Sequence, residues 1–202
     1  MKKLLLSLIA VAGLALTTQA QTEKGTWTLG GDVELNTGKV DGNPKSDVSW
    51  LVEPTVGYFV SNNFEVGTGI GYSYDKSYSA IASFKNTAFV VSPYARAYKN
   101  ITDQFKFFGQ LSVPMSFGKD KIGDANGDNF AKTGSENNIG VALSPGFAFF
   151  PSKRFGIEFS VNGISYNDTR NKDANGDKLY DSKDFSFGAN FFTPKIGVKF
   201  YL

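Results

Sequence analysis

Apolar and polar residues alternate along most of this chain after residue 20. Between residues 64 and 74, even positions hold apolar, aromatic or threonine side chains, whereas odd positions hold glycine, serine or Glu65. The same period of two recurs in residues 105–117 and 154–162. No segment shows the apolar spacing of 3.6 residues that is typical of an amphipathic helix. The pattern therefore predicts strands with one apolar face and one small or polar face.

Eight segments follow this pattern and are predicted to be strands. They are residues 26–37, 47–60, 64–74, 86–98, 104–118, 137–150, 154–166 and 184–202. Many of them are longer than the ~5–6 residues usual in soluble sheets. They are long enough for the about 9–11 residues with which a tilted strand crosses a bilayer. The lengths favour a membrane barrel over a soluble sandwich.

The connections between these strands alternate between short and long. Short connections are expected at 61–63, 99–103 and 151–153, and long polar ones at 38–46, 75–85, 119–136 and 167–183. Short turns on one rim and long loops on the other are typical of outer-membrane barrels, which have periplasmic turns and extracellular loops. With an even number of strands, both chain ends are expected on the side of the short turns.

Proline recurs at one place in every second strand, as Pro54, Pro93, Pro145 and Pro194. A proline has no N–H to donate, so within a sheet it normally marks an edge or a bulge. A closed barrel has no edge, and the prolines therefore predict four β-bulges. In the last strand the outward set is expected to change from odd to even positions around Pro194.

The first twenty residues have the features of a secretory signal. Lys2 and Lys3 precede an apolar run over residues 4–16, and small residues lead to Ala20. The run is shorter than the roughly 20 residues that a helix needs to span a bilayer. We therefore expect a signal peptide at residues 1–20, cleaved before Gln21, and one mature domain at residues 21–202.

Composition removes several classes of function. The chain has 21 basic and 19 acidic residues, and two of the basic ones lie in the signal, so the mature domain is electrically balanced. This balance gives no reason to expect a nucleic-acid partner. The chain has no cysteine and no histidine, which excludes disulfides, thiol chemistry and the commonest general base and metal ligand. No serine lies in a Gly-x-Ser-x-Gly context, and an enzyme is not expected.

The chain end carries the most specific resemblance to a known family. Lys195, Gly197, Phe200 and Leu202 fall on the four defined positions of the terminal signal that the barrel-assembly machinery reads, although the family more often ends in an aromatic residue. With its eight strands, the chain resembles the small outer-membrane β-barrels of the OmpA/OmpX type. The resemblance implies an all-β, antiparallel up-and-down transmembrane barrel in the bacterial outer membrane. It also implies the lipid bilayer and, through residues 195–202, the assembly machinery as partners, and we expect a monomer.

The second face of the strands is expected to line the lumen. Its charged and amide residues are Asp32, Glu34, Glu53, Glu65, Glu158, Arg96, Lys106, Arg154, Lys195, Lys199, Gln110, Asn162 and Asn190. An eight-stranded barrel has room for side chains but not for a wide channel. Isolated buried charges are costly, so acid–base pairs are expected to form a polar plug, with glycines making space. The alternative is a narrow ion pathway.

The outward aromatic residues are expected to form two belts at the membrane interfaces. The belt near the short turns comprises Trp27, Tyr58, Phe64, Phe105, Phe149, Phe155 and Phe200, and the belt near the loops comprises Trp50, Tyr72, Tyr74 and Phe117. The alternative is that these rings form the core of a soluble barrel. In that case the charges would lie outside.

Two long loops share the motif Asp-Ala-Asn-Gly-Asp. Its oxygen-bearing residues are Asp124, Asn126 and Asp128 in one loop and Asp173, Asn175 and Asp177 in the other, and residues 41–43 hold a fragment of it. The motif resembles the start of a calcium-binding loop. However, Asn129 and Lys178 stand where such a loop has glycine, and Ser135 and Asp184 stand where it has glutamate. We expect turns built by Asp and Asn-Gly, with calcium binding as the alternative.

The sequence leaves three functions open. The first is a structural barrel or one that interacts through its surface loops, and the second is a narrow pore or passage for small solutes or hydrophobic molecules. The third is a soluble periplasmic ligand-binding barrel. No catalytic, cofactor-binding or metal-binding residue is assigned from the sequence, and no cofactor is expected.

Overall fold

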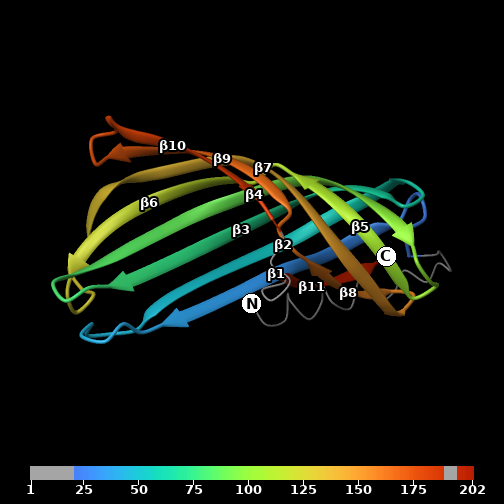
Figure 1. Cartoon of the computed structure of the whole chain (residues 1–202), viewed down its shortest axis with the longest axis horizontal. Helices are drawn as coiled ribbons and strands as arrows, with labels where there is room; N and C mark the ends of the chain where they lie inside the picture. Colours follow the sequence, from blue (N-terminus) through green and yellow to red (C-terminus); the bar gives the residue numbers. More distant parts are fainter. Residues whose placement is uncertain (1–20, 189–194) are drawn as a thin grey trace, which may run out of the picture.

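A computed structural model describes residues 21–188 and 195–202, and these residues form an all-β structure (Figure 1). The strands are β1 (Trp27–Gly38), β2 (Asp47–Ser61), β3 (Phe64–Tyr78), β4 (Ala82–Asn100), β5 (Phe105–Ser112), β6 (Met115–Asp124), β7 (Ala131–Ser152), β8 (Phe155–Ser160), β9 (Ile164–Asp173), β10 (Lys178–Phe187) and β11 (Lys195–Tyr201). β5 and β6 are two parts of one predicted strand, as are β8 and β9, and β10 and β11. The predicted count of eight strands is therefore confirmed.

Antiparallel pairing closes the barrel in its inner half, the half that carries the short turns. The ring runs through β1, β2, β3, β4, β5, β7, β8 and β11, and β11 pairs with β1 to complete it. Every neighbour in the ring is antiparallel, as hairpin connections require. Because closure pairs all edges, the backbone donors and acceptors of this half are satisfied without water.

The outer half, which carries the loops, is paired differently at one seam. There β6, β9 and β10 continue the wall, and β10 pairs with β9. The pairing of β1 with β11 runs from Thr28 to Asp32 and stops there. Among the described residues, no strand pairs with the remaining edge of β1 or with the far edge of β10. The side chains on these two edges include the most exposed apolar ones of the strands, Val33, Leu35, Phe185 and Phe187.

The two ends of the barrel differ as expected, but the loops are shorter than predicted. Figure 1 shows three turns and the C-terminus at one end and four connections at the other. β3 continues to Tyr78 and β4 begins at Ala82, so most of the predicted loop 75–85 is strand. The predicted loops 119–136 and 167–183 shrink in the same way, because β6, β7, β9 and β10 extend into them. Above the membrane a strand can continue with polar side chains on both faces, and composition therefore does not mark its end.

The predicted bulges at the prolines are wrong for the three that the structure describes. The register passes through Pro54, Pro93 and Pro145 without a shift. The interruption lies instead in the neighbouring strand, where the N–H of Val113 donates to the carbonyl of Pro93 at the break between β5 and β6. The N–H of Val161 likewise donates to the carbonyl of Pro145 between β8 and β9. A proline offers no donor to its neighbour, so the ladder is broken there rather than bulged.

Apolar side chains cover the outside of the barrel. In β3, the outward residues from Phe64 to Tyr74 extend over ten residue steps, which is about 33 Å at a rise of ~3.3 Å per residue. At the strand tilt usual in such barrels, this length gives a height of about 25 Å, which matches the apolar band of outer-membrane barrels. Among the described residues there is no helix of the length and apolarity needed to cross a membrane. Residues 1–20, Asn190 and Pro194 lie outside the described part of the chain.

Candidate functional site: the barrel lumen

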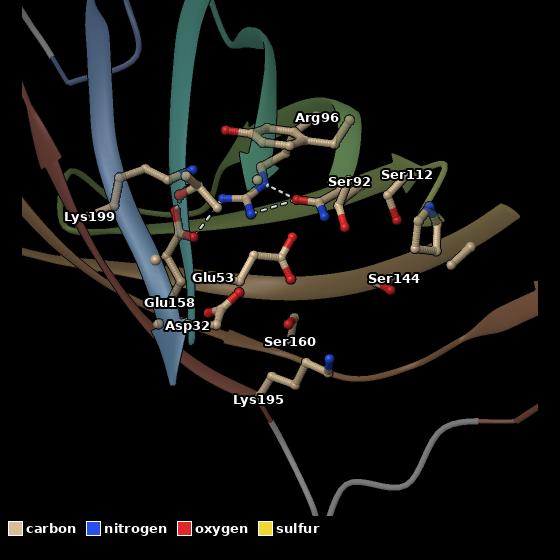
Figure 2. Close-up of a pocket in the computed structure, with 18 of the residues that line it drawn as sticks. Asp32, Glu53, Ser92, Arg96, Ser112, Ser144, Glu158, Ser160, Lys195 and Lys199 are labelled. Carbon is tan, nitrogen blue, oxygen red and sulfur yellow. Dashed lines mark hydrogen bonds and ion pairs between the residues drawn. The ribbon is translucent and has the colours of Figure 1, made fainter. Parts of the chain in front are cut away.

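Four charged side chains meet inside the barrel. Arg96 of β4 and Glu158 of β8 form an ion pair with Nη1 and Oε2 2.6 Å apart. Lys199 of β11 lies 3.2 Å from Oε1 of Glu65 in β3 and 3.5 Å from Oε1 of Glu158. All four side chains are buried. Figure 2 shows Arg96, Glu158 and Lys199 converging from different strands. We call Glu65, Arg96, Glu158 and Lys199 the charge network.

Hydroxyl and amide groups complete the hydrogen bonding of the charge network. Thr28 and Tyr94 donate to Oε1 of Glu65 over 2.6 and 2.8 Å. Two guanidinium nitrogens of Arg96 donate to Oε1 of Gln110. The network holds two acids and two bases, so it is neutral, and its lone pairs and protons are largely used. Buried charges need this kind of compensation to be stable.

A layer of aromatic rings lies on the periplasmic side of the charge network. It consists of Phe59, Tyr98, Phe108, Phe150 and Tyr201, all buried, and we call it the aromatic layer. The hydroxyl of Tyr98 lies 3.0 Å from Glu65 and 3.2 Å from Glu158, which joins the layer to the network. The centroid of the Tyr98 ring lies 5.6 Å from that of Phe59 and 5.7 Å from that of Phe108.

The sequence reasoning missed the aromatic layer and expected only polar or small residues inside. The signal for it was present in aromatic doublets near the short turns: 58–59, 107–108, 149–150 and 200–201. Consecutive residues of a strand point to opposite faces, so each doublet places one ring in the lipid belt and one in the lumen.

A polar cavity of about 290 Å³ lies on the outer side of the charge network. Figure 2 shows Asp32 and Glu53 directed into it, with serines of the opposite wall facing them. Asp32 and Glu53 are direct cross-strand partners on β1 and β2. The serines are Ser92, Ser112, Ser144 and Ser160. The cavity is a vestibule that ends at the charge network.

A second cavity of about 390 Å³ adjoins the vestibule at the seam, where it is lined by residues of β1 and of the start of β11. It shares Asp32 and Lys195 with the vestibule, and its other lining residues are Val33, Glu34, Leu35, Asn36 and Ile196. Nζ of Lys195 lies 2.7 Å from Oε1 of Glu34, so these two lumen residues form an ion pair across β11 and β1.

The other predicted lumen residues are more dispersed. Lys106 is buried near the short turns and donates to the hydroxyl of Thr22, and it forms no ion pair with the carboxylates of the charge network in the described residues. Asn162 lines the vestibule, and Arg154 is half-buried beside the turn between β7 and β8. Asn190 lies outside the described residues. The expected acid–base pairing is therefore concentrated in the charge network and in the pair of Lys195 and Glu34.

Rings predicted for each of the two belts contact one another between neighbouring strands. On the side of the short turns, the Trp27 and Tyr58 centroids are 4.9 Å apart, and those of Phe105 and Phe149 are 4.7 Å apart. On the loop side, Trp50 stacks on Tyr74 with centroids 5.7 Å apart. Large apolar residues lie outside and charges inside, which is the reverse of a soluble barrel. The soluble alternative is therefore wrong.

The two repeated loop motifs fold into matching turns. Oδ1 of Asp124 accepts hydrogen bonds from the N–H groups of Asn126 and Asp128, each over 3.0 Å. Asp173 accepts equivalent bonds from Asn175 and Asp177 over 2.9 Å. The leading carboxylate of each motif therefore organises its own turn, in agreement with the turn interpretation. In the described part of the chain, no group of three or more acidic side chains is arranged to hold a metal ion.

Solved structures similar to this chain include the outer membrane protein OprG, the attachment invasion locus protein Ail and a Neisserial surface protein. OprG from Pseudomonas aeruginosa is 13% identical with a TM-score of 0.47, covering 91% of this chain and 99% of its own. Ail from Yersinia pestis is 18% identical with a TM-score of 0.41, covering 89% and 99%. Neisserial surface protein A is 13% identical with a TM-score of 0.42, covering 87% and 94%. A comparison with curated proteins gave no match.

The family assignment comes from a sequence profile that spans nearly the whole chain. Residues 6–191 match the family described as the outer membrane protein beta-barrel domain. The match agrees with the closed antiparallel ring, the apolar outer surface and the interface belts. This chain belongs to the outer membrane protein beta-barrel family and is a protein of the bacterial outer membrane.

Proposed function

We propose that this protein is a structural or surface-interacting barrel whose lumen is closed by its own side chains. The ion pair between Arg96 and Glu158 carries this proposal, because it links β4 and β8 through the interior of the barrel. Lys199 and Glu65 add a second link between β11 and β3. A hydrated ion entering from the vestibule meets a neutral network whose hydrogen bonds are largely satisfied, and it gains little by displacing them.

The aromatic layer supports the same proposal. Behind the charge network, the rings of Phe59, Phe108 and Phe150 are buried together in the periplasmic half of the lumen. An ion crossing this layer would lose its hydration without finding compensating charges. With the lumen closed, the surfaces left for interaction are the loops and the outer rim. The alternative of a narrow ion pathway would require both layers to move.

Planar-bilayer recording tests the closed lumen. We expect the purified protein to give no large, steady conductance. A double variant, Arg96→Ser with Tyr98→Ala, removes a side chain from each layer and is expected to open a measurable conductance. The matched control, Phe107→Ala, removes an outward ring and is expected to remain silent. Steady conductance of the unmodified protein would overturn the proposal.

A second candidate function is passage of small apolar molecules from the vestibule into the bilayer. The specific observation in its favour is the cavity of about 390 Å³ beside β1, which shares Asp32 and Lys195 with the vestibule and is also lined by the apolar residues Val33, Leu35 and Ile196. Uptake of a small apolar fluorophore into proteoliposomes tests it. Asn36→Trp would fill part of the seam cavity and should slow uptake, whereas Thr37→Trp, on the lipid face, should not. Passage would be excluded if liposomes with the unmodified protein, liposomes with either variant and protein-free liposomes all took up the fluorophore at the same rate.

Two further proposals concern how the barrel reaches the membrane. We propose that residues 1–20 are a signal removed before Gln21, and that residues 195–202 engage the barrel-assembly machinery. The mass of the protein isolated from outer membranes tests the first, since cleavage elsewhere gives a different mass. Replacing Phe200 with Asp should reduce assembly in cells, whereas Lys195→Gln should reduce it less. We further propose a monomer, which sedimentation in detergent tests.

A further inference from the structure

A row of lysines crosses four neighbouring strands in the outer half of the barrel. Lys76 of β3 is the direct cross-strand partner of Lys85 in β4, which is also the partner of Lys121 in β6. Lys121 in turn is the partner of Lys132 in β7. Directly opposed residues of an antiparallel pair have Cβ atoms about 4.5–5.5 Å apart and lie on the same face of the sheet. We call these four residues the lysine row.

The lysine row lies on the outer, lipid-facing side and just above the aromatic belt. Lys76 follows the belt residue Tyr74 by two positions, and Lys121 follows Phe117 by four, so each shares the outward face of its strand. Two to four residue steps correspond to about 7–13 Å along a strand, and less along the membrane normal because the strands are tilted. A headgroup layer is about 5–8 Å thick on each side of the hydrocarbon. The row is therefore at the level of the lipid headgroups.

The barrel compensates the row at one end only, where Nζ of Lys76 donates to the carbonyl of Gly127 over 3.1 Å and the carboxylate of Asp128 acts on the same ammonium group. None of the ion pairs within 4.0 Å in the described residues includes any of these four lysines. Asp120 is adjacent to Lys121 in sequence but lies on the inner face, where it accepts a hydrogen bond from Asn86 over 2.7 Å. Like charges directly opposite each other destabilise a sheet. Anions supplied from outside would relieve the repulsion of three such contacts in succession.

Aromatic rings hold part of the row in place. Nζ of Lys76 and Nζ of Lys85 lie 4.9 and 5.5 Å from the centroid of Phe130, which comes from the connection between β6 and β7. Nζ of Lys85 also lies 5.1 Å from the Tyr74 ring of the belt. Such contacts stabilise ammonium groups without neutralising them. The lysines therefore keep their full charge and lie next to the surface that lipid chains cover.

We propose that the lysine row binds the phosphate groups of anionic lipids in the outer leaflet. The proposal rests on the membrane placement of the barrel and goes beyond its closed lumen. Two phosphates on one lipid headgroup can be shared between neighbouring lysines, which relieves their mutual repulsion. Each lysine near an anionic membrane surface contributes about a fivefold gain in affinity. Binding should therefore depend on several members of the row together.

Native mass spectrometry of the refolded protein tests the proposal. The probe is bisphosphorylated lipid A, compared with dephosphorylated lipid A carrying the same acyl chains. The test variant is Lys85→Gln with Lys121→Gln and Lys132→Gln. The matched control, Lys24→Gln with Lys99→Gln and Lys153→Gln, removes the same charge from exposed positions on the periplasmic rim. We expect the unmodified protein and the control to prefer the phosphorylated lipid, and the test variant to bind it at least tenfold more weakly.

Stability measurements separate lipid binding from a folding defect. In zwitterionic detergent the test variant should unfold within a few degrees of the unmodified protein, because the repulsion that is removed offsets the lost contacts of Lys85 with Tyr74 and Phe130. In phosphorylated lipid the test variant should unfold at a clearly lower temperature than the unmodified protein. The single variant Lys121→Gln provides the same comparison with a smaller change. Equal binding of the two lipids by the unmodified protein, or equal losses in test and control variants, would overturn the proposal. Full competition by millimolar inorganic phosphate would also overturn it, because it would indicate a site for free phosphate.

Discussion

Arg96 and Glu158 lie on different walls of the barrel and meet in the lumen, with Nη1 and Oε2 2.6 Å apart. The two side chains are about equally buried, at 10% exposure each. Pairing at this depth depends on both partners, because neither charge has water to replace the other. Substituting either partner should therefore change the stability of the barrel.

Arg96→Met should destabilise the barrel strongly. It leaves two carboxylates facing Lys199 alone, and breaking a buried pair costs about 3–5 kcal/mol. The double variant Arg96→Met with Glu158→Met restores neutrality and should recover most of the loss. Unfolding in urea from lipid vesicles measures both. If the two single losses simply add in the double variant, the pair does not act as a coupled unit.

The exposed pair of Lys178 and Asp181 is the control for this prediction. Its nitrogen–oxygen distance of 2.6 Å equals that of the buried pair, but the lysine side chain is 66% exposed. Exposed pairs typically contribute about 0–1 kcal/mol. Lys178→Met should therefore change stability little, so a large loss would show that distance, rather than burial, sets the contribution.

Gly57→Ala should disturb the charge network from the wall of the barrel. A Cβ at this position would overlap Oε1 of Glu65 and lie 2.6 Å from the hydroxyls of Thr28 and Tyr94. Overpacking of this kind costs about 1–3 kcal/mol. Gly109→Ala is the matched control, since its Cβ would meet no atom within 4 Å. Thermal unfolding followed by gel mobility should separate the two variants, and equal midpoints would contradict the expectation.

The sequence predicted which side of the barrel most residues face, because the period of two fixes the face of every residue in a strand. Trp27 and Phe64 outside and Glu65 and Glu158 inside follow from that pattern. The strand ends were not predictable in the same way. Residues such as Lys76 and Lys121 read as loop by composition, yet their backbones continue the ladder above the membrane.

The sequence could not predict which lumen residues meet. Lys199 contacts both Glu65 and Glu158, far apart along the chain, because β11 lies between β1 and β8 and the interior is narrow. The effect of proline was also misjudged. Reasoning from one strand places the irregularity at Pro93 itself. In the structure it lies in the neighbouring strand, where the ladder breaks between β5 and β6 at Val113, opposite the proline that has no N–H to donate. Such compensation between strands is a property of the sheet.

The loop turn at Asp124 should weaken in acid. Its pKa lies below the ordinary value, chiefly because the N–H of Asp128 donates to the carboxylate. A lowered pKa means that the ionised form stabilises the turn above the unfolded-state pKa, and that this stabilisation is lost as the pH falls through the folded-state pKa. Amide hydrogen exchange of Asp128, corrected for intrinsic exchange, should rise over that window, which lies below pH 4. Constant protection throughout the window would contradict the expectation.

Two variants separate the charge of Asp124 from its role as an acceptor. Asp124→Asn keeps an acceptor oxygen and should retain the turn without the pH dependence, whereas Asp124→Ala should lose the turn. Asp173→Ala, in the matching turn, should leave exchange at Asp128 unchanged. A calcium titration of the unmodified protein belongs to the same experiment. Protection of both turns that rises with calcium would favour the calcium-loop alternative.

The fluorescence of the two tryptophans should be quenched from the two opposite membrane interfaces, at a similar depth in each. Trp27 lies on the side of the short turns and is 54% exposed on the outer surface, and Trp50 stacks on Tyr74 in the loop-side belt. Aromatic belts lie at the headgroup level, so lipids brominated near the glycerol should quench Trp50 in Trp27→Phe and Trp27 in Trp50→Phe.

A tryptophan placed between the belts provides the depth control for this experiment. Leu111 is 50% exposed on the outer surface of β5, six residues above Phe105 of the short-turn belt and six below Phe117 of the loop-side belt. In the background that lacks both natural tryptophans, Leu111→Trp should be quenched best by lipids brominated near the methyl end, because the hydrocarbon centre lies between the belts. If all three positions were quenched best by the same lipid, the two belts would not mark the membrane interfaces.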